Sequence, residues 1–133
     1  MMYMLDTNAI IMAVRHPDWP IYRKVKRHLG KDLCISVVTY GELEYGIAKS
    51  SNPMRNRAAI TQILSGIRIL DFNAAAAEHF GDFFADLEAR HLRIGDRDMM
   101  IAAHARSLGY TVVTDNVDEF SRVKGLKYVN WKE

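Results

Sequence analysis

The chain has little cysteine, little proline and no long hydrophobic run. Its single cysteine, Cys34, excludes a disulfide framework and a cysteine zinc site. No apolar run approaches the roughly 20 residues that a membrane-spanning helix needs. The first residues lack the basic region of a signal peptide and reach an acid at Asp6. We therefore expect a cytoplasmic protein with no signal peptide and no membrane partner.

Several catalytic motifs are also missing. The sequence has no GxxxxGK[ST] loop for nucleoside triphosphates, no GxSxG elbow and no HExxH pair. Position 8 is Asn8, whereas aspartyl-phosphate phosphatases carry a second Asp two residues after the first. The formal net charge of +2 is too small to indicate a nucleic-acid binder, and it excludes no partner.

The sequence alternates short apolar runs with segments in which apolar residues recur at helical spacing. With 133 residues, 49% of them hydrophobic, the chain is expected to form one domain, residues 1–133. The apolar runs at 1–5, 33–38, 67–72, 110–114 and 126–129 predict strands. Strands that alternate with helices pair in parallel through right-handed crossovers. We therefore expect a three-layer α/β/α sandwich with a central parallel sheet of about five strands, the first strand being central.

Acidic residues follow these strands or begin the helices between them. Asp6 ends the first strand, Glu42 lies in the helix after the second, and Asp115 follows the fourth. Asp98 lies in the first turn of a helix expected from Asp96 to Leu108. Because the carboxyl ends of parallel strands meet at one edge of the sheet, these acids can converge there.

A cluster of carboxylates has a characteristic chemistry. The groups repel one another and raise each other's pKa unless a cation lies between them. The natural occupant is Mg²⁺ or Mn²⁺, which accepts a few carboxylate oxygens and keeps several waters. Such an ion polarises a phosphoryl oxygen and orients or deprotonates an attacking water. The pattern therefore favours phosphodiester hydrolysis.

Two of these acids also have a purely structural interpretation as helix caps. The carboxylate of Asp6 could accept an unpaired N–H at the start of the next helix. The spacing Thr39-x-x-Glu42 fits a capping box, in which Glu42 would bond the backbone at its own helix start. For Glu42 we favour positioning of a metal or a water.

The acids later in the chain also have both a structural and a functional interpretation. Asp96 and Asp98 both suit the positive end of a helix dipole, which is the better explanation for Asp96, whereas we favour function for Asp98. Asp115 and Asn116 could form the outer edge of the site or simply turn the chain. Glu119 belongs to a solvated face or leans into the cleft.

Basic and aromatic residues offer candidate RNA contacts. Arg97, between two acids, is the most pointed candidate for binding a phosphate, ahead of the basic residues between Arg15 and Lys31. Trp19, Tyr40 and Tyr45 could stack on unpaired bases, although core packing is the more common role of such side chains.

Four motifs in order resemble one family. They are Leu5-Asp6-Thr7-Asn8, Ser36-x-x-Thr39-x-x-Glu42-Leu43-x-x-Gly46, Ile94-Gly95-x-x-Asp98-x-x-Ile101-Ala102-Ala103-His104-Ala105 and Val113-Thr114-x-x-x-x-x-Phe120. Together they resemble PIN-domain ribonucleases, and within that superfamily the VapC toxins of toxin–antitoxin pairs. The resemblance covers nearly the whole chain, including Trp131.

The resemblance implies an Mg²⁺- or Mn²⁺-dependent endoribonuclease, homodimeric and inhibited by a cognate VapB-type antitoxin, with transfer or ribosomal RNA as substrate. The alternatives are an RNA-processing PIN nuclease without a toxin role and a PIN-like binding module without catalysis. Asp6, Glu42 and Asp98 match the three core acids, with Asp6 and Asp98 as metal ligands. The fourth acidic position falls on Asn116, with Asp115 one residue earlier, which favours one metal at rest. Thr7, Asn8, Arg97 and Thr114 are the neighbouring residues expected to contact substrate.

Overall fold

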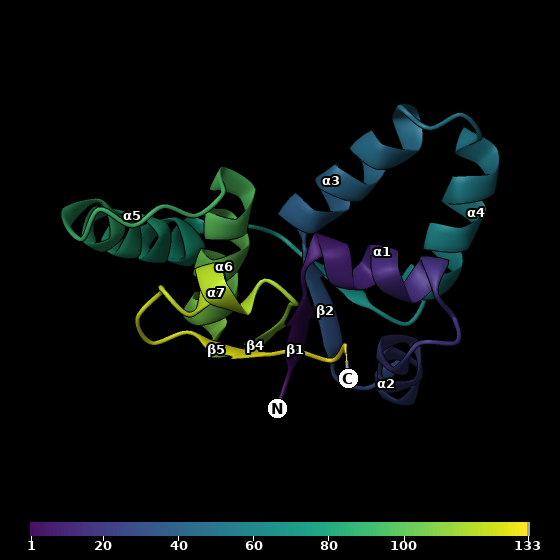
Figure 1. Cartoon of the computed structure of the whole chain (residues 1–133), viewed down its shortest axis with the longest axis horizontal. Coiled ribbons are helices and arrows are strands. Elements are labelled where there is room, and N and C mark those ends of the chain that lie inside the picture. Colours follow the sequence, from purple (N-terminus) through teal and green to yellow (C-terminus); the bar gives the residue numbers. More distant parts are fainter. Residues whose placement is uncertain (133) are drawn as a thin grey trace.

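The computed structural model describes residues 1–132 and consists of a parallel sheet with helices on both faces (Figure 1). The sheet contains β1 (Tyr3–Leu5), β2 (Leu33–Ser36), β3 (Arg68–Leu70), β4 (Thr111–Val113) and β5 (Lys127–Val129), in the order β3-β2-β1-β4-β5. Every neighbouring pair is parallel. β1 is central, as predicted, and the three-layer α/β fold is confirmed.

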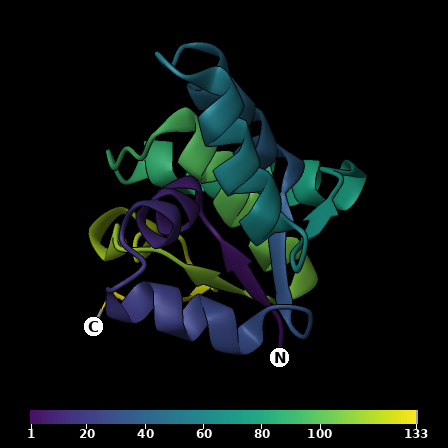
Figure 2. The same ribbon diagram turned by 90° about the vertical axis from the view of Figure 1, so that its right-hand side faces the viewer.

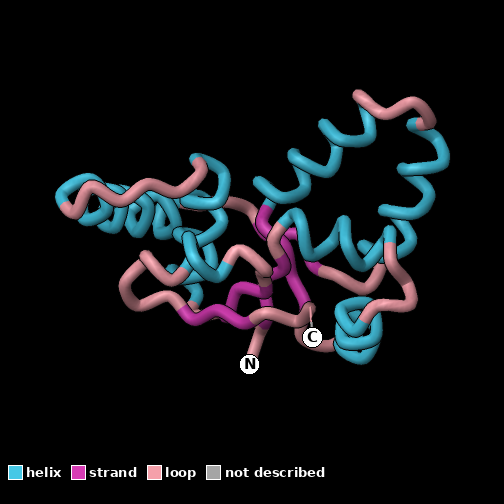
Figure 3. Tube along the Cα trace, in the orientation of Figure 1, coloured by secondary structure: helices cyan, strands magenta, loops and turns pink. Residues whose placement is uncertain are grey.

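The helices connect these strands. They are α1 (Thr7–Arg15), α2 (Pro20–His28), α3 (Val37–Ala48), α4 (Pro53–Leu64), α5 (Ala74–Ala89), α6 (Asp96–Leu108) and α7 (Val117–Phe120). Figure 3 shows the short strands gathered at the centre with helices around them. No helix among the described residues is both long and apolar enough to cross a membrane.

Alternation along the strands explains the two helical layers. Met4 and Val112 point to a core that includes Phe83 and Leu87 of α5 and the apolar residues of α6. Leu5 and Val113, one residue later on the same strands, belong to a second core with residues of α1, α2, α3 and α4. Successive side chains of a strand point to opposite faces, so short apolar strands can support a core on each side. Figure 2 shows α1 and α2 lying on one side of the strands.

The second strand ends earlier than the apolar run predicted. The run at 33–38 suggested a strand, but the structure turns at Ser36, whose hydroxyl accepts a hydrogen bond from the N–H of Val38 at 3.1 Å. Val37 and Val38 therefore begin α3. An N-cap hydrogen bond here overrides the strand preference of two β-branched residues.

Trp131, after β5, packs against α2 and the start of β1. Trp131 is buried, and its ring lies 4.9 Å from those of Tyr3 and His28. His28 ends α2, so this contact ties the end of the chain to α2 and to the start of β1.

Candidate active site at the carboxyl edge of the sheet

Asp6 occupies the point where β1 ends and α1 begins. Its side chain is 3% exposed, and its Oδ1 accepts a hydrogen bond from the N–H of Ala9 at 2.8 Å. Burial raises the pKa of Asp6 from 3.8 to about 7, against the opposing hydrogen bonds from Thr114 and Ala9, and the charges of Asp98 and Asp115 add to the increase. Asp6 is therefore a helix cap and, at the same time, a member of an acidic cluster.

Asp98 faces this cluster from the first turn of α6. Burial raises its pKa, and the charges of Glu119 and Glu42 raise it further. The side-chain amide of Asn116 donates to Oδ2 of Asp98 at 3.5 Å, which opposes that increase. The fold thus brings together Asp98, in the first turn of α6, and Asn116, in the turn after β4.

Glu42 does not form the capping box that its spacing with Thr39 suggested. Ser36, not Thr39, caps α3. Thr39 is fully buried, and its hydroxyl has no hydrogen-bond partner among residues 1–132. The capping-box interpretation is wrong, and the carboxylate of Glu42 is left to reach across to other elements.

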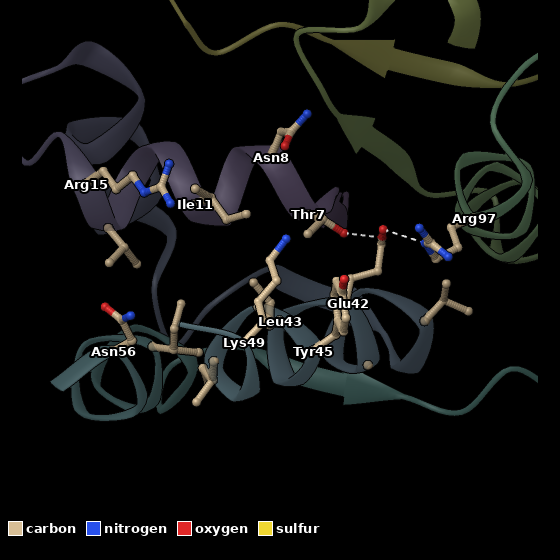
Figure 4. Close-up of a pocket in the computed structure, with 16 residues that line it drawn as sticks. Thr7, Asn8, Ile11, Arg15, Glu42, Leu43, Tyr45, Lys49, Asn56 and Arg97 are labelled. Atoms are coloured by element: carbon tan, nitrogen blue, oxygen red, sulfur yellow. Dashed lines mark hydrogen bonds and ion pairs between the residues drawn. The ribbon is translucent and has the colours of Figure 1, made fainter. Parts of the chain in front are cut away.

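Two side chains hold Glu42 (Figure 4). The hydroxyl of Thr7, at the start of α1, donates to Oε1 at 2.5 Å. Nε of Arg97, from α6, donates to Oε2 at 2.8 Å. Glu42 therefore joins α1, α3 and α6 at the edge of the sheet.

A cleft of about 860 Å³ opens beside Glu42, between α1, α3 and α4. Thr7 and Asn8 line one end of it with Glu42 and Arg97. Much of its wall is apolar, from Ile11, Val14, Val38, Leu43, Ile47 and Ile60. Figure 4 shows Arg15 at the end of α1 remote from Arg97. Glu42 and Arg97 therefore lie at the end of the cleft remote from Arg15, and of the predicted acids Glu42 is the one that lines it.

The turn after β4 supplies the remaining predicted residues. Thr114 is buried, and its hydroxyl accepts from the N–H of Asn116 at 2.9 Å while bonding Asp6. Asp115 is partly buried, and its charge acts on Asp6. Thr114 thus connects the turn to Asp6. The only sign of this role in the sequence is that a hydroxyl residue directly precedes the polar pair Asp115-Asn116.

Glu119 has a positioning contact that the sequence did not predict. Its Oε1 accepts from the backbone N–H of Gly95 at 2.9 Å, at the start of α6. The carboxylate both supports the helix that carries Asp98 and raises the pKa of Asp98. Glu119 therefore leans toward the cluster.

Other candidates lie outside the cluster. Asp96 is exposed. The α2 helix carries the basic residues Arg23, Lys26 and Arg27, and its last residue, His28, packs against Tyr3 at the amino end of β1. That is the edge of the sheet opposite Asp6.

Of the three aromatic candidates, two are packed against other residues and one lines the cleft. Trp19 stacks on His16 with ring centroids 3.5 Å apart, and Tyr40 packs against the core. Tyr45 is 64% exposed and lines the cleft. Only Tyr45 of these three is placed to meet a molecule in the cleft.

The donor set fits a hard divalent cation in chemistry but is not gathered around one point. Among residues 1–132, no group of three His, Cys, Asp or Glu side chains is arranged to hold a metal ion. Asp6 and Asp98 nevertheless have raised pKa values because they are buried close to other acids, and a cation would relieve that repulsion. Carboxylate oxygens are the ligands that Mg²⁺ and Mn²⁺ prefer.

Comparison with known proteins agrees with this geometry. The PIN domain family model matches residues 3–126. Ribonuclease VapC2 of Haemophilus influenzae is 43% identical over 129 residues, which is 97% of each chain. The tRNA(fMet)-specific endonuclease VapC of Shigella flexneri has the same identity and coverage.

A solved structure shows the same fold. The chain aligns with the crystal structure of VapBC2 from Rickettsia felis, bound to a DNA fragment from their promoter, with a TM-score of 0.92. The two are 34% identical, and the alignment covers 98% of this chain and 99% of the other. The chain therefore belongs to the PIN-domain family and, within it, to the VapC ribonucleases. PIN-domain nucleases generally use divalent metal ions.

Proposed function

We propose that this chain is a metal-dependent endoribonuclease toxin that hydrolyses RNA phosphodiester bonds by water attack. The observation that carries the proposal is the pair of carboxyls, Asp6 and Asp98, whose pKa values are raised by burial and by the charges of neighbouring acids at the carboxyl edge of the sheet. Burying acids beside one another costs stability, and a divalent cation offsets that cost.

Each side chain has a defined task in this proposal. Asp6 and Asp98 would hold Mg²⁺ or Mn²⁺, which when bound supplies a Lewis acid for the phosphoryl oxygen and lowers the pKa of a water. Glu42 orients the attacking water, and Thr7 fixes its Oε1. Thr114 orients Asp6.

Residues at the edge of the site are proposed to contact the RNA. Asn8 lines the cleft, and Arg97 lines the same end of it as Glu42, where a phosphate of the RNA would be bound. Asp115 and Asn116 shape the outer rim, and the amide of Asn116 takes part by bonding Asp98.

Transfer RNA is the proposed substrate, and an antitoxin the proposed partner. The Shigella flexneri relative is named for tRNA(fMet), and the Rickettsia felis structure is a VapBC complex. An antitoxin segment that lies on the apolar wall of the cleft would cover Glu42. We place the activity in the cytoplasm, where these RNAs are found.

Cleavage of purified transfer RNA tests the proposal. The parent chain should give discrete fragments with Mg²⁺ and none with EDTA, and Asp98→Asn should lower the rate by at least about 100-fold. Asp118→Asn is the matched control because its side chain is 87% exposed and pairs with Arg122 outside the cleft. Equal cleavage by Asp98→Asn and the parent chain would refute the assignment of the site.

A further inference from the structure

Arg97 has an unusual position for a residue beside a cation site. It lies between Asp96 and Asp98 in the first turn of α6, yet its guanidinium turns across to α3 and pairs with Glu42 at 2.8 Å (Figure 4). The side chain of Arg97 is 68% exposed, whereas that of Glu42 is 23% exposed. Arg97 therefore approaches Glu42 from the solvent side.

Both oxygens of Glu42 are engaged in this arrangement. Oε1 accepts from the neutral hydroxyl of Thr7, and Oε2 accepts from Arg97. A guanidinium keeps its charge at any ordinary pH, so it leaves a carboxylate only by moving away. A divalent cation close to Oε2 would repel it.

Resting on the proposed function, we infer that Arg97 is an internal competitor of the catalytic cation, which occupies Glu42 until a cation displaces it. The 2.8 Å contact of Nε with Oε2 directs this oxygen of Glu42 toward α6 and the guanidinium. Arg97 is thus a positioning residue that sets cation affinity through Glu42.

The competition has a limited size because the ion pair is largely exposed. Exposed pairs contribute up to about 1 kcal/mol, which corresponds to roughly a five-fold change in an equilibrium constant. Removing Arg97 should therefore tighten cation binding by about two- to five-fold.

Titration calorimetry of the full chain with Mn²⁺ alone tests this inference. Arg97→Met should lower the Kd for Mn²⁺ by that factor, and Glu42→Gln should raise it. In the double variant, Arg97→Met should have no further effect, because the residue through which it acts is gone. Arg15→Met is the charge-matched control, since Arg15 lies at the far end of the cleft, eight residues along α1 from Thr7 and thus about 12 Å away.

The outcomes separate the inference from the proposed function. An unchanged or weaker Kd in Arg97→Met, or the same tightening in the Glu42→Gln background or in Arg15→Met, would overturn the competition. Absence of Mn²⁺ binding by the parent chain would instead refute the proposed cation site, and the inference with it.

Discussion

Replacing Asp6 by Asn is expected to stabilise the cation-free protein at pH 8, although it removes a residue of the proposed active site. Asp6 is 3% exposed and lies close to Asp98 and Asp115. Asn keeps the side-chain oxygen that accepts from Ala9, so the cap of α1 survives. What it removes is a buried negative charge.

The magnitude follows from the pKa of Asp6, which is raised from 3.8 to about 7. The folded state holds the proton more tightly than the unfolded chain does. The stability that this proton gives is therefore fully present below pH 3.8 and is lost as the pH rises to about 7. At about 1.4 kcal/mol per pH unit, the complete loss is at most about 4 kcal/mol.

The variant should recover part of that loss. Asn does not replace the hydrogen bond that Thr114 makes to a charged oxygen, so we expect a gain of about 2 kcal/mol in the free energy of unfolding at pH 8. At pH 5, where Asp6 is protonated in the folded protein, the difference between variant and parent should nearly vanish.

Urea unfolding in EDTA at both pH values measures the effect. With Mg²⁺ at 100 times its Kd, the parent should gain about 2.7 kcal/mol and Asp6→Asn much less. Asp118→Asn, with its side chain 87% exposed, controls for loss of an acid elsewhere. Destabilisation by Asp6→Asn of equal size at pH 5 and pH 8 would refute the argument, because it would mean that Asp6 acts only as a cap.

Two further predictions concern the turn after β4 and the closing tryptophan. Asn116→Asp replaces the donor to Asp98 by a fourth carboxylate, so it should raise the pKa of Asp98 and tighten Mn²⁺ binding by at least about five-fold in calorimetry; weaker binding would contradict this role of Asn116. Trp131→Ala should lower the free energy of unfolding in urea by about 3 kcal/mol, because it removes a buried ring from contact with Tyr3 and His28. A loss below about 1 kcal/mol would show that this contact does not hold the end of the chain.

The fold was largely predictable because its signals are local. Buried strands appear as apolar runs, and asparagine is a common residue at a helix start: Asn52, followed by Pro53, caps α4, and Asn73 caps α5. The end of β2 was not predictable from propensity, because Ser36 and Thr39 are equivalent capping residues in sequence. In the structure Ser36 is the residue that caps α3.

The candidate site was predictable in part for a related reason. Positions at the ends of parallel strands meet at one edge, which places Asp6 and Asn116 near Asp98. No comparable rule predicts where a long side chain on a neighbouring helix will point. The pairing of Arg97 with Glu42, 55 residues apart, and the bond from Glu119 to Gly95 depend on how helices pack, so sequence alone did not indicate them.

The most direct test of the central claim is the location of Mn²⁺ by anomalous X-ray diffraction from crystals of this chain. The account predicts an anomalous peak bound by carboxylate oxygens of Asp6 and Asp98, with Glu42 beside it and Arg97 turned away from Oε2. A peak elsewhere, or no peak at Asp6 and Asp98 at saturating Mn²⁺, would contradict the claim that these acids form the catalytic centre.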